Sequence, residues 1–165
     1  AVLAAKHLGA ENLFAIDMIP ERLGKAMDFG AIPLNPSSVN VKEQILGVTQ
    51  GRGADAVMEV VGSSETLKLA IDLVRPGGII SSVGVHTADH FSFSPIEAYN
   101  KNITYKSGRC PAYYYSKKLL SEEVPQSYDI ENIITHEFPL KEGARAYEVF
   151  DKKTDNCIKA VLLAT

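Results

Sequence analysis

The chain has 165 residues, of which 45% are hydrophobic and 22% charged, and its formal net charge is −3. This length is enough for one domain with a sizeable core. The small net charge and the scattered lysines and arginines exclude a basic surface for nucleic acid or for an anionic membrane. No apolar run is long enough to cross a bilayer. Two cysteines without a C-x-x-C spacing are too few for a disulfide scaffold, and we expect a reducing, cytoplasmic compartment.

Two periodicities alternate through the first half of the chain. Short, continuously apolar runs indicate strands buried on both faces, and the stretches between them have helical periodicity. In chain order we expect helix 1–8, strand 13–16, helix 20–29, strand 31–34, a turn and helix cap at 35–38, a helix to about residue 50, strand 54–62, a helix from residue 64, a tight turn at 75–78 and strand 79–84. This order predicts an α/β fold with a doubly wound parallel sheet of the Rossmann type.

The alternation changes after residue 85. The remaining pattern predicts short strands at 91–93 and 103–106, a helix at 116–123, a strand at 133–140, a helix at 142–153 and a closing strand at 158–164. We find no internal repeat, low-complexity tract or long linker.

Asp17 stands at the carboxyl end of the first predicted strand and is the strongest local chemical signal. In a dinucleotide-binding βαβ unit, the acidic residue that ends the second strand accepts hydrogen bonds from the adenosine ribose hydroxyls. The same carboxylate would repel a 2′-phosphate, so it favours NAD over NADP. Alternatively, Asp17 caps the helix that begins near Pro20, and the residue alone supports both interpretations about equally.

The start of the chain bears on this interpretation. The glycine-rich turn expected about 20 residues before Asp17 would fall before Ala1. The opening Ala1-Val2-Leu3-Ala4-Ala5-Lys6 has neither an initiator Met nor a helix cap. We therefore expect an N-terminally truncated domain, with the first, central strand of its sheet and its glycine-rich turn missing. Because the neighbours of that strand would be left unpaired, we expect a piece of a longer chain.

A series of short phrases runs through the sequence in a characteristic order. The phrases are KHLGA at 6–10, IDMIPERL at 16–23, GADAVMEVVG at 53–62, LVRPGG at 73–78, VGV at 83–85, NKN at 100–102, KSGRCP at 106–111, ITH at 134–136 and KTDNCIKAVL at 153–162. Together they resemble the zinc-type alcohol dehydrogenases of the medium-chain superfamily. Each phrase is weak by itself, but the series covers nearly the whole chain in the order of the family.

The resemblance implies roles for eight residues in binding NAD. Asp17 would hold the adenosine ribose, with Arg22 over the adenine side or the same ribose. Segment 61–62 follows a strand where the family packs apolar atoms against the riboses. Segment 83–85 lies where backbone groups hold the nicotinamide carboxamide, and Lys159 lies where a basic residue often meets the pyrophosphate. The implied cofactor-binding residues are Asp17, Arg22, Val61, Gly62, Val83, Gly84, Val85 and Lys159.

The resemblance also implies what the chain does not hold. The family's zinc ligands come from an N-terminal catalytic domain, so we expect zinc only there, with no catalytic or metal-binding residue in this sequence. Residues 1–132 would form a partial dinucleotide-binding domain, and residues 133–165 would return toward the absent domain. The parent enzyme would transfer hydride between NAD and a small alcohol or aldehyde as a homodimer or homotetramer. We expect the chain alone to be inactive.

Two alternatives stay open at this stage. One is a zinc-free medium-chain reductase of the quinone-reductase type, which Asp17 and the ITH phrase at 134–136 disfavour. The other is a non-catalytic nucleotide-sensing module. Zinc ligands upstream of a glycine-rich turn would distinguish the enzyme from both alternatives.

Several other residues have simpler explanations. The four histidines share no metal-ligand spacing, so each is best explained as a surface or loop residue, with a substrate-pocket role as the weaker alternative for His86. The Tyr113-Tyr114-Tyr115 run suggests an interdomain or subunit contact, since no basic groove accompanies it. Glu59 lies within an apolar strand and must have a partner or lie at the mouth of a cleft.

Overall fold

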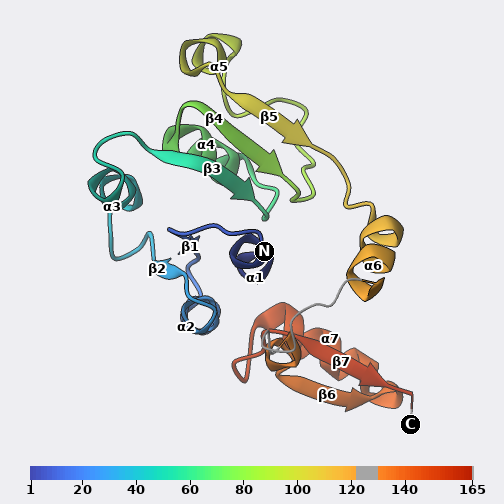
Figure 1. The fold of residues 1–165 in the computed structure, drawn as a ribbon. Helices are drawn as coiled ribbons and strands as arrows, with labels where there is room; N and C mark the ends of the chain where they lie inside the picture. Colours follow the sequence, from blue (N-terminus) through green and yellow to red (C-terminus); the bar gives the residue numbers. More distant parts are fainter. Residues whose placement is uncertain (122–129, 165) are drawn as a thin grey trace. The chain divides into compact units, whose positions relative to one another are not determined.

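The computed structural model describes residues 1–121 and 130–164 and has only parallel strand pairs within them (Figure 1). The strands form three small sheets, with the orders β1-β2, β3-β4-β5 and β6-β7. The chain divides into two compact units, residues 38–118 and residues 1–37 together with 119–165. The prediction of an α/β fold of parallel strands is confirmed, and the predicted domain boundary at residue 132 stays a prediction.

The first four elements are a helix and a βαβ motif. They are α1 (Val2–His7), β1 (Phe14–Ile16), α2 (Pro20–Asp28) and β2 (Ile32–Leu34). Strands β1 and β2 pair in register from Phe14 opposite Ile32 to Ile16 opposite Leu34. Pro20 opens α2 at its first turn, where the missing N–H costs nothing. This unit places the residues that follow β1 immediately before the N-terminus of α2.

The second unit carries a three-stranded sheet. Its elements are α3 (Val41–Val48), β3 (Ala54–Glu59), α4 (Ser64–Leu73), β4 (Val74–Ser82), α5 (Pro95–Lys101) and β5 (Thr104–Ser107). Figure 1 shows α4 lying behind β3 and β4. Its core packs Ala70 and Ile71 of α4 against Val74 and Ile80 of β4. Because all three strands run in parallel, their carboxyl ends meet at one edge of the sheet.

Side-chain caps fix where the helices of this unit begin. Ser63 and Thr66 form a reciprocal capping box at α4, and Ser94 and Glu97 form one at α5. Such caps satisfy backbone N–H groups that the first helical turn leaves without partners. The start of α4 is therefore fixed only a few residues after the end of β3.

The C-terminal elements include a small βαβ motif, in which β6 pairs with β7. After α6 (Ala112–Ser121) come η1 (Ile130–Ile133), β6 (His136–Pro139), η2 (Leu140–Glu142), α7 (Gly143–Lys152) and β7 (Ala160–Leu163). Phe138 of β6 packs with Ala146 and Val149 of α7 and with Cys157.

The structure corrects four local predictions. Residues 75–78 do not form a turn before a strand but lie within β4, where the pairing jumps from Ala54–Val74 to Ala56–Ile79. Residues 91–93 form no strand; instead, Phe91 and Phe93 pack their rings against Tyr105. Helix α3 is capped by Asn40 and not from within 35–38. The predicted helix 116–123 begins earlier, at residue 112, and its last two positions lie outside the described residues.

Candidate functional site

Glu59 is the last residue of β3 and lies at the centre of a hydrogen-bond network. Its side chain is only 1% exposed. One carboxylate oxygen, Oε1, accepts hydrogen bonds from the backbone N–H groups of Val61 at 2.8 Å and Gly62 at 2.7 Å. The Thr66 hydroxyl of α4 donates to the same oxygen at 2.9 Å. The carboxylate therefore fixes the turn that leaves β3 and joins it to the first turn of α4.

The second oxygen of Glu59 binds the end of β4 and the loop that follows it. The Ser82 hydroxyl donates to Oε2 at 3.0 Å, and the Nε2 atom of His86 lies 2.8 Å from the same oxygen. His86 Nε2 also lies 2.8 Å from the Ser82 hydroxyl. Because an ionised carboxylate only accepts hydrogen bonds, Nε2 must carry the proton in its contact with Glu59. Of the two alternatives that the sequence left open for Glu59, the structure shows hydrogen-bond partners.

These contacts determine the charge of Glu59. Burial by itself raises the pKa of this carboxyl, but the N–H groups of Gly62 and Val61 and the hydroxyls of Thr66 and Ser82 outweigh it. The pKa falls from an ordinary value of 4.5 to about 2. Glu59 is therefore ionised throughout the physiological pH range.

The low pKa of Glu59 predicts a specific loss of stability in acid. Because the folded-state pKa is below the unfolded one, the stabilisation is complete above about pH 4.5 and is lost as the pH falls toward 2. This difference corresponds to about 3 kcal/mol of unfolding free energy. Urea unfolding of the full-length protein at several pH values measures this loss. Between pH 4.5 and 2, the free energy of unfolding should fall less for Glu59→Gln than for the wild type.

Glu97 provides a control for that measurement. The Lys68 ammonium and the Ser94 capping bonds hold the pKa of Glu97 at about 2 as well, but its side chain is 43% exposed. Salt screens an exposed carboxylate much more than a buried one. Added salt should therefore reduce the effect of Glu97→Gln and leave that of Glu59→Gln. Equal acid profiles for wild type and Glu59→Gln would contradict this account.

The turns after β3 and β4 pack backbone against backbone. Gly62 has a φ of +93°, and a Cβ atom placed on it would lie 2.7 Å from the amide nitrogen of Val85. A Cβ on Gly84 would lie 2.7 Å from the Cα of Gly62. The N–H groups of Val83 and Gly84 both donate to the backbone oxygen of Glu59, at 2.9 and 3.2 Å. Only glycines at both positions allow this approach.

A pocket of about 820 Å³ opens beside these turns, within residues 38–118. Segment 83–86 lines it on one side, with Arg109 and Cys110 after β5 among the other lining residues. Two valines are conspicuously exposed, with Val61 66% and Val85 80% accessible. Exposed apolar side chains on tightly held turns offer a flat ligand an apolar surface with little ordering cost.

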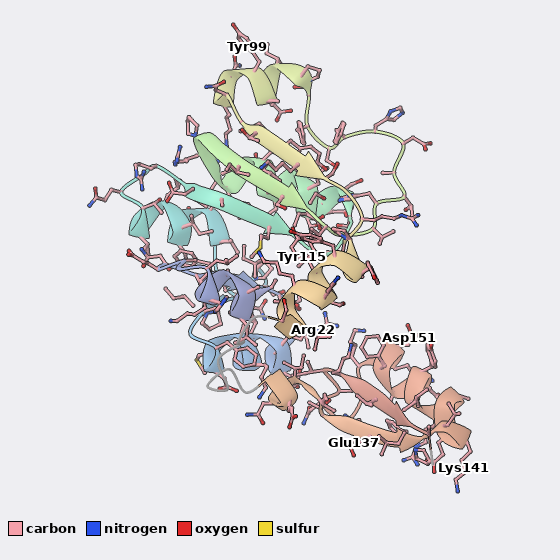
Figure 2. The ribbon with its side chains drawn as sticks, turned by 45° about the vertical axis from the view of Figure 1, so that its right-hand side comes forward. Arg22, Tyr99, Tyr115, Glu137, Lys141 and Asp151 are labelled. Atoms are coloured by element: carbon pink, nitrogen blue, oxygen red, sulfur yellow. The ribbon has the colours of Figure 1, made fainter. Side chains whose placement is uncertain are left out.

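Asp17 and Arg22 form the second predicted group and lie close together. Asp17 follows β1, and Arg22, labelled in Figure 2, comes from α2. One Asp17 oxygen accepts the Ile19 N–H at 2.9 Å, and the other lies 3.5 Å from an Arg22 nitrogen. The N-cap residue of α2 is Ile19, so Asp17 is not itself the helix cap. About a third of each side chain is exposed, which leaves the pair accessible to a ligand.

Lys159 lies in the segment before β7, and its side chain is exposed. Its backbone oxygen accepts hydrogen bonds from the N–H groups of Thr135 and His136. The segment is thus anchored to the start of β6, but among the described residues no hydrogen bond or ion pair joins the Lys159 side chain to the other seven predicted residues. Its predicted role at a pyrophosphate stays a prediction.

The eight predicted residues therefore fall into three groups. The structure brings Asp17 to Arg22 and brings segment 61–62 to segment 83–85. Sequence reasoning missed the network that holds the two turns at 61–62 and 83–85, which consists of Glu59, Thr66, Ser82 and His86. A charged residue inside an apolar strand was the available signal, but its partners are 7, 23 and 27 residues away.

Two further findings concern residues 1–121 and 130–164. No group of three or more His, Cys, Asp or Glu side chains there could hold a metal ion. No helix in the same part of the chain is long and apolar enough to span a membrane.

Parallel strands with turns and an acidic residue at their carboxyl ends define a Rossmann-type α/β structure. The sequence profile of a family described as zinc-binding dehydrogenase matches residues 1–124. The chain belongs to this family.

Individual relatives agree with this assignment. The chain is 36% identical to zinc-type alcohol dehydrogenase B of Aspergillus flavus, over 92% of this chain and 36% of that protein. It is 28% identical to an NADP-dependent isopropanol dehydrogenase of Clostridium beijerinckii, over 98% of this chain and 48% of that protein. The structure of an alcohol dehydrogenase from Thermus sp. ATN1 is 38% identical and superposes with a TM-score of 0.92, over all of this chain and 47% of that one. The chain thus spans less than half the length of these relatives.

Proposed function

We propose that this chain supplies the NAD-binding part of a zinc-dependent alcohol or aldehyde oxidoreductase. The single observation that carries the proposal is the Asp17–Arg22 pair at the carboxyl end of β1. A carboxylate at this position of a βαβ unit suits the two hydroxyl groups of an adenosine ribose, because it accepts hydrogen bonds from both.

The residues present fit a dinucleotide in two further respects. One oxygen of Asp17 is bound only by Arg22, about a third of whose side chain is exposed, so ribose hydroxyls can reach this oxygen without breaking a buried contact. At Gly62 and Gly84 the backbones after β3 and β4 approach closely, and the side chain of Val85 beside them is exposed. When bound, nicotinamide supplies the carbon that accepts or gives a hydride. The residues of this chain would bind and orient the cofactor.

The described residues hold no ligand set for zinc. We place the metal and most of the substrate pocket in the part of the relatives' length that this chain does not cover. A small alcohol or aldehyde substrate and a homodimer or homotetramer stay proposals, based on the family.

The choice between NAD and NADP tests the proposal. One relative is an NADP-dependent enzyme, and Arg22 is a cation that a 2′-phosphate could use. Because the Asp17 carboxylate lies beside Arg22, we expect the full-length protein to bind NADH at least about 10-fold more tightly than NADPH, since a carboxylate repels a 2′-phosphate. Titration of the fluorescence of each reduced cofactor measures this ratio. A preference for NADPH would overturn the assignment of Asp17, and binding of neither would overturn the proposed function.

A further inference from the structure

One carboxylate joins four segments of the chain at the sheet edge. Glu59 binds the turn after β3 through two N–H groups, α4 through Thr66, the end of β4 through Ser82 and the following loop through His86. A buried carboxylate with five donors is held rigidly, because breaking any contact leaves a charge or a polar group less well satisfied.

His86 connects this network to the loop at residues 83–92, which follows β4. Residues 83–92 are all described, and His86 is the only one among them whose side chain hydrogen-bonds to a strand residue. Its side chain is 22% exposed and lines the pocket.

Val85 is held from both sides as a consequence. Before it, Gly84 packs on Gly62 and donates to the backbone of Glu59. After it, His86 binds the Glu59 carboxylate. The Val85 side chain is nevertheless 80% exposed. A segment fixed at both ends that still presents its residue to solvent is preorganised for a ligand, which lowers the entropy lost on binding.

We propose that Glu59 and His86 are positioning residues that hold segment 83–85 in place for the nicotinamide half of the dinucleotide. The inference rests on the proposed function. In it, neither residue touches the cofactor. Glu59 holds the His86 imidazole through its Nε2–H group. Because His86 directly follows Val85, this contact also holds the backbone of segment 83–85 in the position in which it binds the ligand. Asp17 and the adenosine half are independent of this network.

The test compares two ligands in the full-length protein. NADH engages both halves of the site, whereas ADP reaches only the adenosine half. For His86→Ala we expect NADH binding to weaken about 10-fold, because the loop must be ordered on binding. ADP binding should stay within about twofold of the wild type. A general loss of structure would weaken both ligands together, so the ratio of the two effects separates positioning from folding.

Conservative variants sharpen the comparison. The terminal amide of glutamine reaches about as far as Nε2 of histidine, so His86→Gln keeps a donor for Glu59 and should restore NADH affinity to within about threefold. Asparagine is shorter, so His86→Asn should behave like His86→Ala. Glu59→Gln should weaken NADH more than ADP. The matched control is Asp55→Asn, the same kind of change at the exposed other end of β3, which should alter neither affinity.

The outcomes are distinguishable. If His86→Ala and His86→Asn bind NADH as tightly as the wild type, or lose NADH and ADP affinity equally, the positioning role is wrong. If His86→Gln fails to restore affinity, anchoring by Glu59 is not what His86 provides, and the proposal is likewise overturned. If the wild type binds ADP but not NADH, or neither, the failure lies in the proposed function itself.

Discussion

Replacing Gly62 by alanine is expected to abolish measurable NADH binding and to lower the unfolding free energy by about 3 kcal/mol or more. The φ of +93° is unfavourable for alanine, and the added Cβ would overlap backbone atoms of Val85, which cannot move aside by a change of rotamer as a flexible side chain could. The segments after β3 and β4 would have to separate, and the Glu59 bonds to the Val61 and Gly62 N–H groups would break. Urea unfolding and NADH titration of the full-length protein measure the two effects.

Substitutions at two other glycines separate the effect of backbone strain from the effect of the clash between the two turns. Gly51 has a φ of +81° with nothing within 4 Å of where a Cβ would lie, so Gly51→Ala should cost only the backbone strain, about 1–2 kcal/mol, with NADH binding kept. Gly84 lacks the positive φ but has the same close approach, so Gly84→Ala should resemble Gly62→Ala in its effect on NADH. A Gly62→Ala protein that binds NADH normally would show that the contact between the two turns is not needed.

Replacing Asp17 by serine is expected to shift the ratio of NADH to NADPH affinity by about 100-fold or more toward NADPH. Loss of charged hydrogen bonds to the ribose hydroxyls should weaken NADH about 10- to 100-fold. Removal of the carboxylate also ends its repulsion of a 2′-phosphate and frees the Arg22 guanidinium 3.5 Å away. Parallel titrations of both cofactors with wild type and variant measure the shift.

Two variants control for this interpretation. Asp28→Ser makes the same change at the other end of α2, where the carboxylate pairs with Lys25, and should leave the ratio unchanged. Adding Arg22→Met to Asp17→Ser should remove the gain in NADPH affinity while NADH stays weak. If Asp17→Ser leaves the ratio as in the wild type, Asp17 has only its local contacts with Ile19 and Arg22, and its assignment to the ribose is wrong.

The elements that were predictable from sequence are those set by local chemistry. Continuous apolar runs indicated the parallel strands, and Pro20 marked the start of α2. The prediction of a turn at 75–78 was wrong for a physical reason. A positive φ at Gly77 is equally compatible with a turn and with a bulge, and only pairing with β3 decides between them. Likewise, alternating aromatics at 91–93 suggested a strand, but their rings pack on Tyr105 without strand pairing.

In the candidate site, too, the local features were predictable from sequence and the long-range contacts were not. Asp17 was identifiable because its role follows from its position at a strand end, and Arg22 lies only five residues further on. The Glu59 network and the Gly62–Gly84 contact join segments more than 20 residues apart, and no local pattern encodes such contacts. The sequence could show that Glu59 needs a partner, but not that Ser82 and His86 provide it.

Hydrogen exchange tests the central claim most directly, because it reports where on the chain a ligand acts. Amide exchange of the full-length protein should be followed by mass spectrometry without ligand, with saturating ADP and with saturating NADH. The account predicts that both ligands slow exchange in peptides covering residues 14–22, and that only NADH also slows it in residues 59–66 and 82–90. Saturating NADH that leaves residues 59–66 and 82–90 unprotected would contradict it.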